Sequence, residues 1–227
     1  MRADKILTQL KVLKNERNIR GMARFGILGK NILGIPKPRL DAIARKIGKD
    51  QDLSLALWKS EIHEARILAS LIGIPAKVTS AQMEKWVKDF DAWNVCDQVC
   101  GNLFDRTPYA AAKALKWSGR KREYEKRAGF VLMAEMAVHD KRAPDSLFLS
   151  FLPVLRREAW DERNFVKKAV NWALRQIGKR NEKLRKAALA EAARVQKQDS
   201  VSARWIAADA IRELQNPKTP IRKLPIS

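Results

Sequence analysis

The sequence predicts an all-α protein built as a stack of helical hairpins. Apolar residues recur at intervals of three and four, as on one face of a helix, and no segment shows the sustained two-residue alternation of a half-buried strand. Threonine, which favours strands, occurs only four times in 227 residues. The pattern indicates about a dozen helices of roughly 10 to 18 residues joined by short turns. Short links between helices favour antiparallel neighbours.

Such helices pack either as a bundle or as a stack of hairpins. No fixed period is visible, so any repeats are degenerate. We favour the stack, because it offers a long concave surface that suits a long polyanion. The expectation is an α-α superhelix with a concave basic groove: a single domain over residues 1–214, then a frayed, basic, proline-containing tail over 215–227.

The prolines mark where helices are expected to end. All nine are predicted to lie between helical segments, because a proline inside a helix removes a backbone hydrogen bond. They are Pro36, Pro38, Pro75, Pro108, Pro144, Pro153 and three in the last eleven residues.

Charge gives the first indication of a partner. Lys plus Arg number 46 against 25 acidic residues, a formal net charge of +21. If displayed on one face, this excess attracts polyanions, most often nucleic acid. The alternative is a generally adhesive basic surface of the ribosomal kind.

The chain shows the features of a cytoplasmic protein. Two cysteines in 227 residues form no disulfide framework, which indicates a reducing compartment. No apolar run approaches the roughly 20 residues of a membrane span. The opening MRADKILTQLKVLK has the basic character of a transit peptide, but Asp4 and the apolar spacing favour an ordinary first helix.

Apolar spacing predicts a helical segment from Trp58 to Ile72. Its stripe is formed by Trp58, Ile62, Ala65, Leu68, Ala69 and Ile72. Between them lie Glu61, His63, Glu64 and Arg66, which we interpret as an interhelical salt-bridge face.

The segment FDAWNVCDQVCGNLF, residues 90–104, combines cysteines, aromatics and a carboxylate. As a helix, it has an apolar side of Ala92, Cys96, Val99, Cys100 and Leu103. Trp93 and Asp97 form an i, i+4 pair at the edge of that side. Asp97 is either a helix-edge partner of a basic side chain or a carboxylate that stays ionised, orients a water or faces developing positive charge. The cysteines are interpreted as buried small hydrophobic residues rather than zinc ligands.

A later helix carries an arginine in an apolar row. Tyr124, Arg127, Val131, Ala134 and Val138 share one face, and methionines and leucine cover much of the other, so this helix is expected to be buried almost all round. Arg127 cannot lose its charge and needs an anion, either a structural carboxylate or a ligand phosphate.

The helix predicted over Phe165 to Ile177 has a tryptophan off its core face. Its apolar stripe runs through Val166, Ala169, Val170, Ala173 and Ile177. Trp172 lies about 120° away, beside Lys168 and near Arg175, by the 100° advance per residue of a helix. The position suits either a nucleic-acid surface or packing against a neighbouring helix.

Several common catalytic patterns are missing from the sequence. It has no phosphate-binding glycine loop, no G-x-S-x-G and no H-E-x-x-H, and it has only two histidines. Any enzymatic chemistry must therefore depend on carboxylate, arginine and aromatic side chains.

Across nearly its whole length the sequence resembles the DNA alkylation repair proteins with HEAT-like repeats, the AlkD type of alkylpurine DNA glycosylase. The matching blocks occur in order: GMARFGI, LGIPKPRLDAIARKIGK, LALWKSEIHEARILASLIG, WNVCDQVCGNLF, EKRAGFVLMAEMAVHDK and NFVKKAVNWALRQIGKRN. The fold that the resemblance implies is a superhelix of degenerate HEAT-like repeats.

The resemblance also implies site residues. Trp93 and Asp97 match the family's tryptophan–aspartate pair, Arg127 in EKRAG matches its arginine, and Trp172 in AVNWALR matches its second tryptophan. For the family's N-terminal aromatic the nearest candidates are Phe25 and Met22, and neither is a tyrosine. The CDQVCGNLF block also departs from the aspartate-rich form associated with active enzymes.

The implied activity is hydrolysis of the N-glycosidic bond of N3- or N7-alkylated purines in duplex DNA, without metal or organic cofactor. Asp97 is the expected catalytic residue, Trp93, Trp172 and Phe25 contact the lesion nucleotide, and Arg127 and Lys168 hold phosphate. The expected protein is a monomer without an obligate protein partner or membrane, in the cytoplasm near the nucleoid.

Two other functions fit the same residues. One is a non-catalytic binder of damaged or branched DNA on the same scaffold, since some members of the family have no demonstrated glycosylase activity. The other is a helical-repeat adaptor for an acidic protein or RNA.

Overall fold

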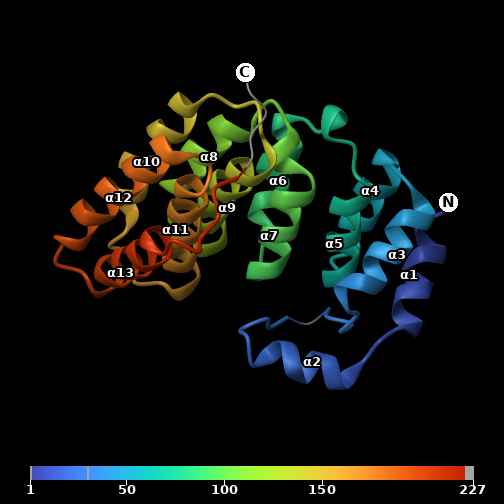
Figure 1. The fold of residues 1–227 in the computed structure, drawn as a ribbon. Helices are drawn as coiled ribbons and strands as arrows, with labels where there is room; N and C mark the ends of the chain where they lie inside the picture. Colours follow the sequence, from blue (N-terminus) through green and yellow to red (C-terminus); the bar gives the residue numbers. More distant parts are fainter. Residues whose placement is uncertain (1, 30, 223–227) are drawn as a thin grey trace. The chain divides into compact units, whose positions relative to one another are not determined.

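The computed structural model describes residues 2–29 and 31–222, and every regular element in this part of the chain is helical (Figure 1). The all-α prediction is confirmed. The elements are α1 (Ala3–Val12), α2 (Glu16–Ala23), α3 (Lys37–Ile47), α4 (Gln51–Trp58), α5 (His63–Ile72), η1 (Pro75–Lys77), α6 (Ser80–Lys88), α7 (Trp93–Asn102), η2 (Phe104–Arg106), α8 (Ala110–Ser118), α9 (Glu123–His139), α10 (Asp145–Glu158), α11 (Asn164–Gly178), α12 (Glu182–Gln196) and α13 (Val201–Gln215). None of the described helices is long and apolar enough to cross a membrane.

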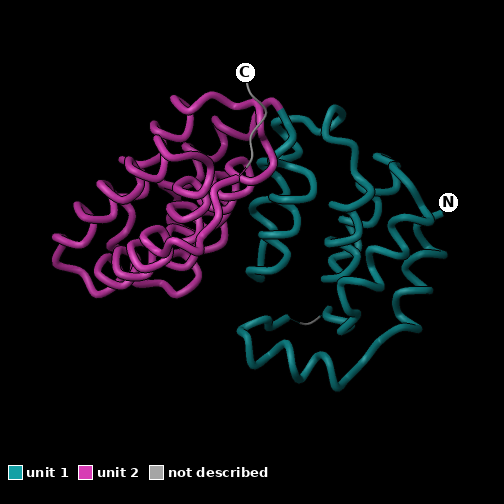
Figure 2. Tube along the Cα trace, in the orientation of Figure 1, with its two compact units in different colours: residues 1–107 teal, residues 108–227 magenta. Residues whose placement is uncertain are grey.

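The chain divides into two compact units, unit 1 (residues 1–107) and unit 2 (residues 108–227), coloured separately in Figure 2. Each unit has its own buried apolar core, with Leu57, Leu68 and Val99 fully buried in unit 1 and Phe130, Val170 and Ala207 fully buried in unit 2. The single domain expected over residues 1–214 stays a prediction.

Unit 1 has two layers of helices. One layer holds α1, α4 and α6, and the other holds α3, α5 and α7, while α4 packs on α5 across the layers. Hydrogen bonds between successive hairpins show a constant offset. Gln51 bonds Gln82 and Trp58 bonds Asp89, both 31 residues apart, so α4 and α6 run in the same direction. The same offset of 31 joins His63 of α5 to Asn94 of α7.

Unit 2 repeats the arrangement with a longer spacing. Helices α8, α10 and α12 form one layer, and α9, α11 and α13 the other. Asn171 of α11 bonds Asp209 of α13, 38 residues later, and Gln198 bonds the Arg156 carbonyl at an offset of 42. Hairpins with one spacing in unit 1 and another in unit 2 explain why no single period is visible in the sequence.

Helix α2 is an appendage of unit 1. It has no buried residue, and Figure 1 shows it apart from the two layers of that unit. Its start is fixed by Asn15, whose side chain caps the helix and whose backbone N–H donates to the Leu33 carbonyl at 2.8 Å. Its N-terminal half is held by Asn18, whose amide donates to the Gly34 carbonyl at 2.9 Å.

Two expectations about helix limits are wrong. The segment from Trp58 to Ile72 is not one helix: α4 ends at Trp58 and α5 begins at His63, with Glu61 between them at a φ of 57°. The six stripe residues are nevertheless all buried, because both helices turn their apolar faces to the same core. Pro153 lies inside α10 and not between helices, and its ring is exposed to solvent.

The predicted tail, as far as Arg222, makes hydrogen bonds to the rest of unit 2. The Arg222 backbone N–H donates to the Lys179 carbonyl at 2.9 Å, and its guanidinium donates to the Gln176 carbonyl. Arg185 donates to the carbonyl of Thr219 at 2.8 Å. Thr219 and Arg222 are thereby joined to α12 and to the end of α11, and the frayed tail stays a prediction. Residues 223–227 of the predicted tail lie outside the described residues.

Candidate nucleic-acid interface

Helix α7 positions the tryptophan–aspartate pair as predicted. Its apolar side, including Cys96, Val99 and Cys100, is fully buried, and the cysteines form no disulfide. Trp93 and Asp97 are half-buried at the edge of that side, one helical turn apart. The buried apolar side of α7 and hydrogen bonds from its part-buried side-chain amides to α5 fix the rotation of this helix, and so fix where the Trp93 and Asp97 side chains emerge.

Trp93 is joined to Phe25, the predicted N-terminal aromatic. The Trp93 indole N–H donates to the Phe25 backbone carbonyl at 3.0 Å, across 68 residues of sequence. The Phe25 side chain itself is 72% exposed. Both residues line a cleft of about 700 Å³ together with Met22, the other candidate for this role, and with Arg17, Asn18, Gly21, Ile27, Gly34, Ile35 and Pro36. This volume is in the range of ligand-binding sites.

Buried Glu64 holds the segment that carries this cleft. Its carboxylate accepts backbone N–H bonds from Leu33 at 2.8 Å, Gly34 at 2.6 Å and Ile35 at 3.3 Å. Gly34 has a φ of 72°, and a Cβ there would lie 2.5 Å from the Asn15 carbonyl oxygen. The sequence interpretation of Glu64 as a salt-bridge residue is wrong, because its partners are backbone donors. Arg66 does form an ion pair of the predicted kind, with Asp91 at 3.6 Å.

His63 lies beside this anchor. It is 5% exposed, its backbone N–H donates to the Asn31 carbonyl, and its Nε2 is 2.8 Å from the amide nitrogen of Asn94. Burial lowers the pKa of His63, opposed by the charge of Glu64 and reinforced by that of Arg66. The neutral ring accepts the Asn94 N–H, and Asn94 directly follows Trp93 in α7.

Three cations lie on the helix that precedes the exposed Phe25. Arg17 and Arg20 on α2 and Arg24 at its end are all solvent-exposed. Arg17 also lines the cleft with Trp93. The sequence argument missed these arginines, although the run ERNIRGMARF showed them at helical spacing ahead of Phe25.

In unit 2, α9 is buried almost all round, as predicted, and Arg127 is 6% exposed. Its guanidinium donates to the carbonyl of Phe165 at 2.5 Å, near the start of α11. Tyr124, one turn earlier, packs its ring against Phe165 with centroids 5.7 Å apart. Arg127 thereby ties α9 to the helix that carries Trp172.

Helix α11 has the predicted arrangement, with its five stripe residues fully buried. Trp172 is half-buried and Lys168 exposed. Arg175 was expected to contribute to a basic side of this helix, but it is paired with acidic residues. It pairs with Glu213 and lies 3.6 Å from Asp209, both on α13. Lys168 is thus the exposed cation nearest to Trp172 in sequence.

Another residue that sequence reasoning missed is Arg180, which is 1% exposed. Its guanidinium donates to the carbonyls of Ala137, Asp140 and Ala143 and lies 4.0 Å over the Phe148 ring. It closes the C-terminal end of α9, where helical carbonyls lack partners. An arginine in a loop gives no periodic signal that predicts such a role.

The fold is the class found in HEAT-like repeat proteins. A solved structure described as a new family of proteins related to the HEAT-like repeat DNA glycosylases, with affinity for branched DNA structures, matches 93% of this chain and 95% of its own, with a TM-score of 0.77 and 18% identity. No curated protein sequence matches the chain.

The profile of the family described as DNA alkylation repair enzyme matches residues 6–214. The chain belongs to this family.

Proposed function

We propose that the protein binds DNA and hydrolyses the N-glycosidic bond of N3- or N7-alkylated purines, with Asp97 as the catalytic residue. The observation that carries the proposal is the position of Asp97. It is a half-buried carboxylate one helical turn from Trp93, which lines an aromatic cleft with Phe25. Membership of the DNA alkylation repair enzyme family also supports this proposed activity.

The chemistry needs little from the protein. An alkylated purine carries a positive charge, so its bond to C1′ breaks with the electron pair moving to the base, which leaves neutral. A water oxygen bonds to C1′ and releases a proton. A fixed carboxylate stabilises the positive charge that grows on the sugar and orients this water. Asp97 would supply both effects, and no metal is needed for either.

The other predicted residues bind the DNA. Trp93 and Trp172 would pack against the sugar and backbone of the lesion nucleotide, and Phe25 would contact a neighbouring part of the strand. Arg127 and Lys168 would contact phosphates, with the arginines around α2 holding the flanking duplex. The net charge of +21 supports polyanion binding of this extent.

A second candidate is binding of branched DNA without base release. It is favoured by the structural likeness, at a TM-score of 0.77, to a protein described as having affinity for such structures. The cysteine-containing CDQVCGNLF block around Asp97 supports it as well.

One experiment separates the two candidates. The protein is incubated with duplex DNA containing N7-methylguanine and N3-methyladenine, and free base is measured by chromatography. In parallel, affinity for a four-way junction and for a duplex of equal length is measured at one salt concentration. Base release well above the spontaneous rate supports the glycosylase. Junction preference with no release beyond the spontaneous rate supports the binder and contradicts catalysis by Asp97.

A further inference from the structure

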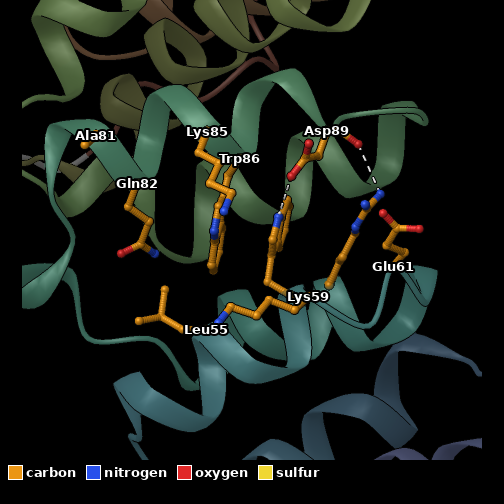
Figure 3. Close-up of a pocket in the computed structure, with 10 residues that line it drawn as sticks. Leu55, Lys59, Glu61, Ala81, Gln82, Lys85, Trp86 and Asp89 are labelled. Atoms are coloured by element: carbon orange, nitrogen blue, oxygen red, sulfur yellow. Dashed lines mark hydrogen bonds between the residues drawn. The ribbon is translucent and has the colours of Figure 1, made fainter.

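A second aromatic site lies in unit 1, in the layer of α4 and α6. Trp58 at the end of α4 and Trp86 of α6 stack face to face, with ring centroids 3.9 Å apart and planes 2° apart. Arg66 lies over the face of Trp58 that is not stacked on Trp86, with its guanidinium carbon 5.2 Å from the Trp58 ring centroid. These rings border a pocket of about 470 Å³, drawn in Figure 3. Its volume is in the range of small-ligand sites.

Nearly buried donors at this pocket lack acceptors. Trp86 is 2% exposed, and its indole N–H, which is not fully enclosed by protein, has no hydrogen-bond partner within residues 2–29 and 31–222. The N–H of Trp58, by contrast, donates to the Asp89 carboxylate at 2.9 Å. Arg66, 7% exposed, donates through Nη1 to the Asp89 carbonyl while its Nε has no acceptor. Buried arginine donors are normally paired, so the unpaired Nε of Arg66 indicates a missing acceptor.

Gln82 adds a third donor whose orientation is fixed. The backbone N–H of Ile74 donates to the Gln51 side-chain oxygen at 3.0 Å, so the Gln51 nitrogen must face Gln82. That nitrogen donates to the Gln82 oxygen at 3.0 Å. The Gln82 amide nitrogen is then left without an acceptor at the pocket wall.

Two lysines reach the pocket from different helices. Lys85 comes from α6, and Lys59 follows α4 and extends toward Leu55 in Figure 3. Both are exposed, and neither has an ion-pair partner in the described part of the chain. Of the two lining carboxylates, Asp89 is engaged by Trp58, and Glu61 lies at the rim with a φ of 57°. The site is therefore rich in donors and positive charge.

The complementary ligand is a flat, partly apolar molecule that carries acceptors and negative charge. Leu55, Ala81 and the indole edges offer the apolar lining, and the lysines suit a phosphate. We propose that the pocket between α4 and α6 binds a nucleotide. Its phosphate lies between Lys59 and Lys85, and its base lies over Leu55 against the tryptophan pair.

Glu61 lies at the opposite end of the pocket from Leu55 (Figure 3), so it does not contact a base that lies over Leu55. The ligand is either an unpaired nucleotide of a DNA strand or a free mononucleotide, since both present the same groups. The inference goes beyond the proposed function, because base release at Asp97 does not require this pocket.

The test is a titration of the full-length protein with dAMP by calorimetry, with deoxyadenosine as the ligand that lacks phosphate. Lys59→Ala/Lys85→Ala is compared with Lys46→Ala/Lys88→Ala, which makes the same charge change at exposed lysines that do not line the pocket. We expect dAMP to bind, deoxyadenosine to bind at least about tenfold more weakly, and only the first double variant to lose about tenfold in affinity. Trp86→Phe keeps an aromatic ring at this position but removes the N–H, and it should weaken dAMP binding severalfold.

A short single-stranded oligonucleotide distinguishes the sources. Loss of oligonucleotide affinity in the Lys59/Lys85 variant, with competition by dAMP, indicates a strand nucleotide. Binding of dAMP with unchanged oligonucleotide affinity indicates a free mononucleotide. Equal losses in both double variants, or no binding of dAMP and oligonucleotide to the wild type, would overturn the proposal. So would binding of polyglutamate in place of dAMP with the same dependence on Lys59 and Lys85, which indicates an acidic protein segment.

Discussion

The indole of Trp93 donates a hydrogen bond to the backbone carbonyl of Phe25 at 3.0 Å. This bond joins α7, which carries Asp97, to the end of the exposed, basic helix α2. The two residues are 68 positions apart in the sequence, and both line the same cleft. The helix that carries the proposed catalytic carboxylate is thus joined by one hydrogen bond to the segment that carries the exposed N-terminal aromatic.

Trp93→Phe tests this link. The variant keeps an aromatic ring and removes the donor, so it should cost about 1 kcal/mol of local stability. The backbone amides of Phe25, Gly26 and Ile27, which all bond within the turn after α2, should exchange with solvent about fivefold faster. Trp205→Phe is the matched control, because that ring is 40% exposed on α13. Unchanged exchange in Trp93→Phe would show that the hydrogen bond does not hold the segment.

Glu64→Gln tests the buried anchor. The carboxylate is nearly inaccessible, at 1% residue exposure, and accepts three backbone N–H bonds. The amide loses the charge and turns a donor toward donors, so unfolding in urea should require about 3 kcal/mol less free energy. Glu182→Gln, at an exposed position of α12, should change it by less than about 0.5 kcal/mol. Equal losses of unfolding free energy in the two variants would contradict the proposal that Glu64 anchors residues 33–35.

The lowered pKa of Asp161 leads us to expect that the protein loses stability in acid. Burial raises the pKa of Asp161, but hydrogen bonds from Arg163 and Lys126 outweigh burial and lower it from 3.8 to about 2. The folded protein therefore holds this carboxylate ionised more strongly than the unfolded chain does. Its contribution, on the order of 2 kcal/mol, is present above pH about 4 and is lost as pH falls toward 2.

The measurement compares wild type with Asp161→Asn by urea unfolding at several pH values. Wild type should be more stable at pH 7, and the difference should shrink below about pH 4 and be mostly lost at about pH 2, where the aspartate of the folded protein is about half protonated. A difference that stays constant between pH 5 and 2 would contradict ion pairing with Lys126 and Arg163.

Lys168→Ala tests the proposed DNA contact of α11. Lys168 is exposed one turn before Trp172, whereas Arg175 is engaged by acids of α13. The variant should bind DNA more weakly, and the slope of log K against log salt should become shallower by about 0.9, the value of one phosphate contact. Lys186→Ala on α12, also exposed, should keep the wild-type slope. Identical slopes in wild type and Lys168→Ala would remove Lys168 from the interface.

Helical periodicity predicted most of the fold because it reports which side chains are buried. It placed the apolar sides of α7 and α11 correctly, including both cysteines. It did not detect the break between α4 and α5, because both helices bury residues of the same stripe and only the backbone at Glu61 changes direction. It also could not show the repeat, since the offset between successive hairpins is 31 residues in unit 1 and 38 or 42 in unit 2.

The sequence was less informative about contacts. The Phe25 carbonyl and the backbone donors that bind Glu64 belong to groups that every residue has, so no residue type marks them. The nucleotide pocket was missed for a related reason. Trp58 and Trp86 each look like core residues in their own helices, and only the packing of α4 on α6 stacks them. Lysines adjacent to both tryptophans, in WKS and EKWVKD, were the available signal.

The role of Asp97 is the central claim, and base release by Asp97→Asn tests it most directly. Single-turnover release of N7-methylguanine from duplex DNA is measured for wild type, Asp97→Asn and Asp91→Asn. Asp91 is an exposed aspartate two residues before α7 and receives the same chemical change. We predict that Asp97→Asn releases base at least about 100-fold more slowly than wild type while binding DNA as well, and that Asp91→Asn matches wild type. Release by Asp97→Asn at the wild-type rate would contradict the account.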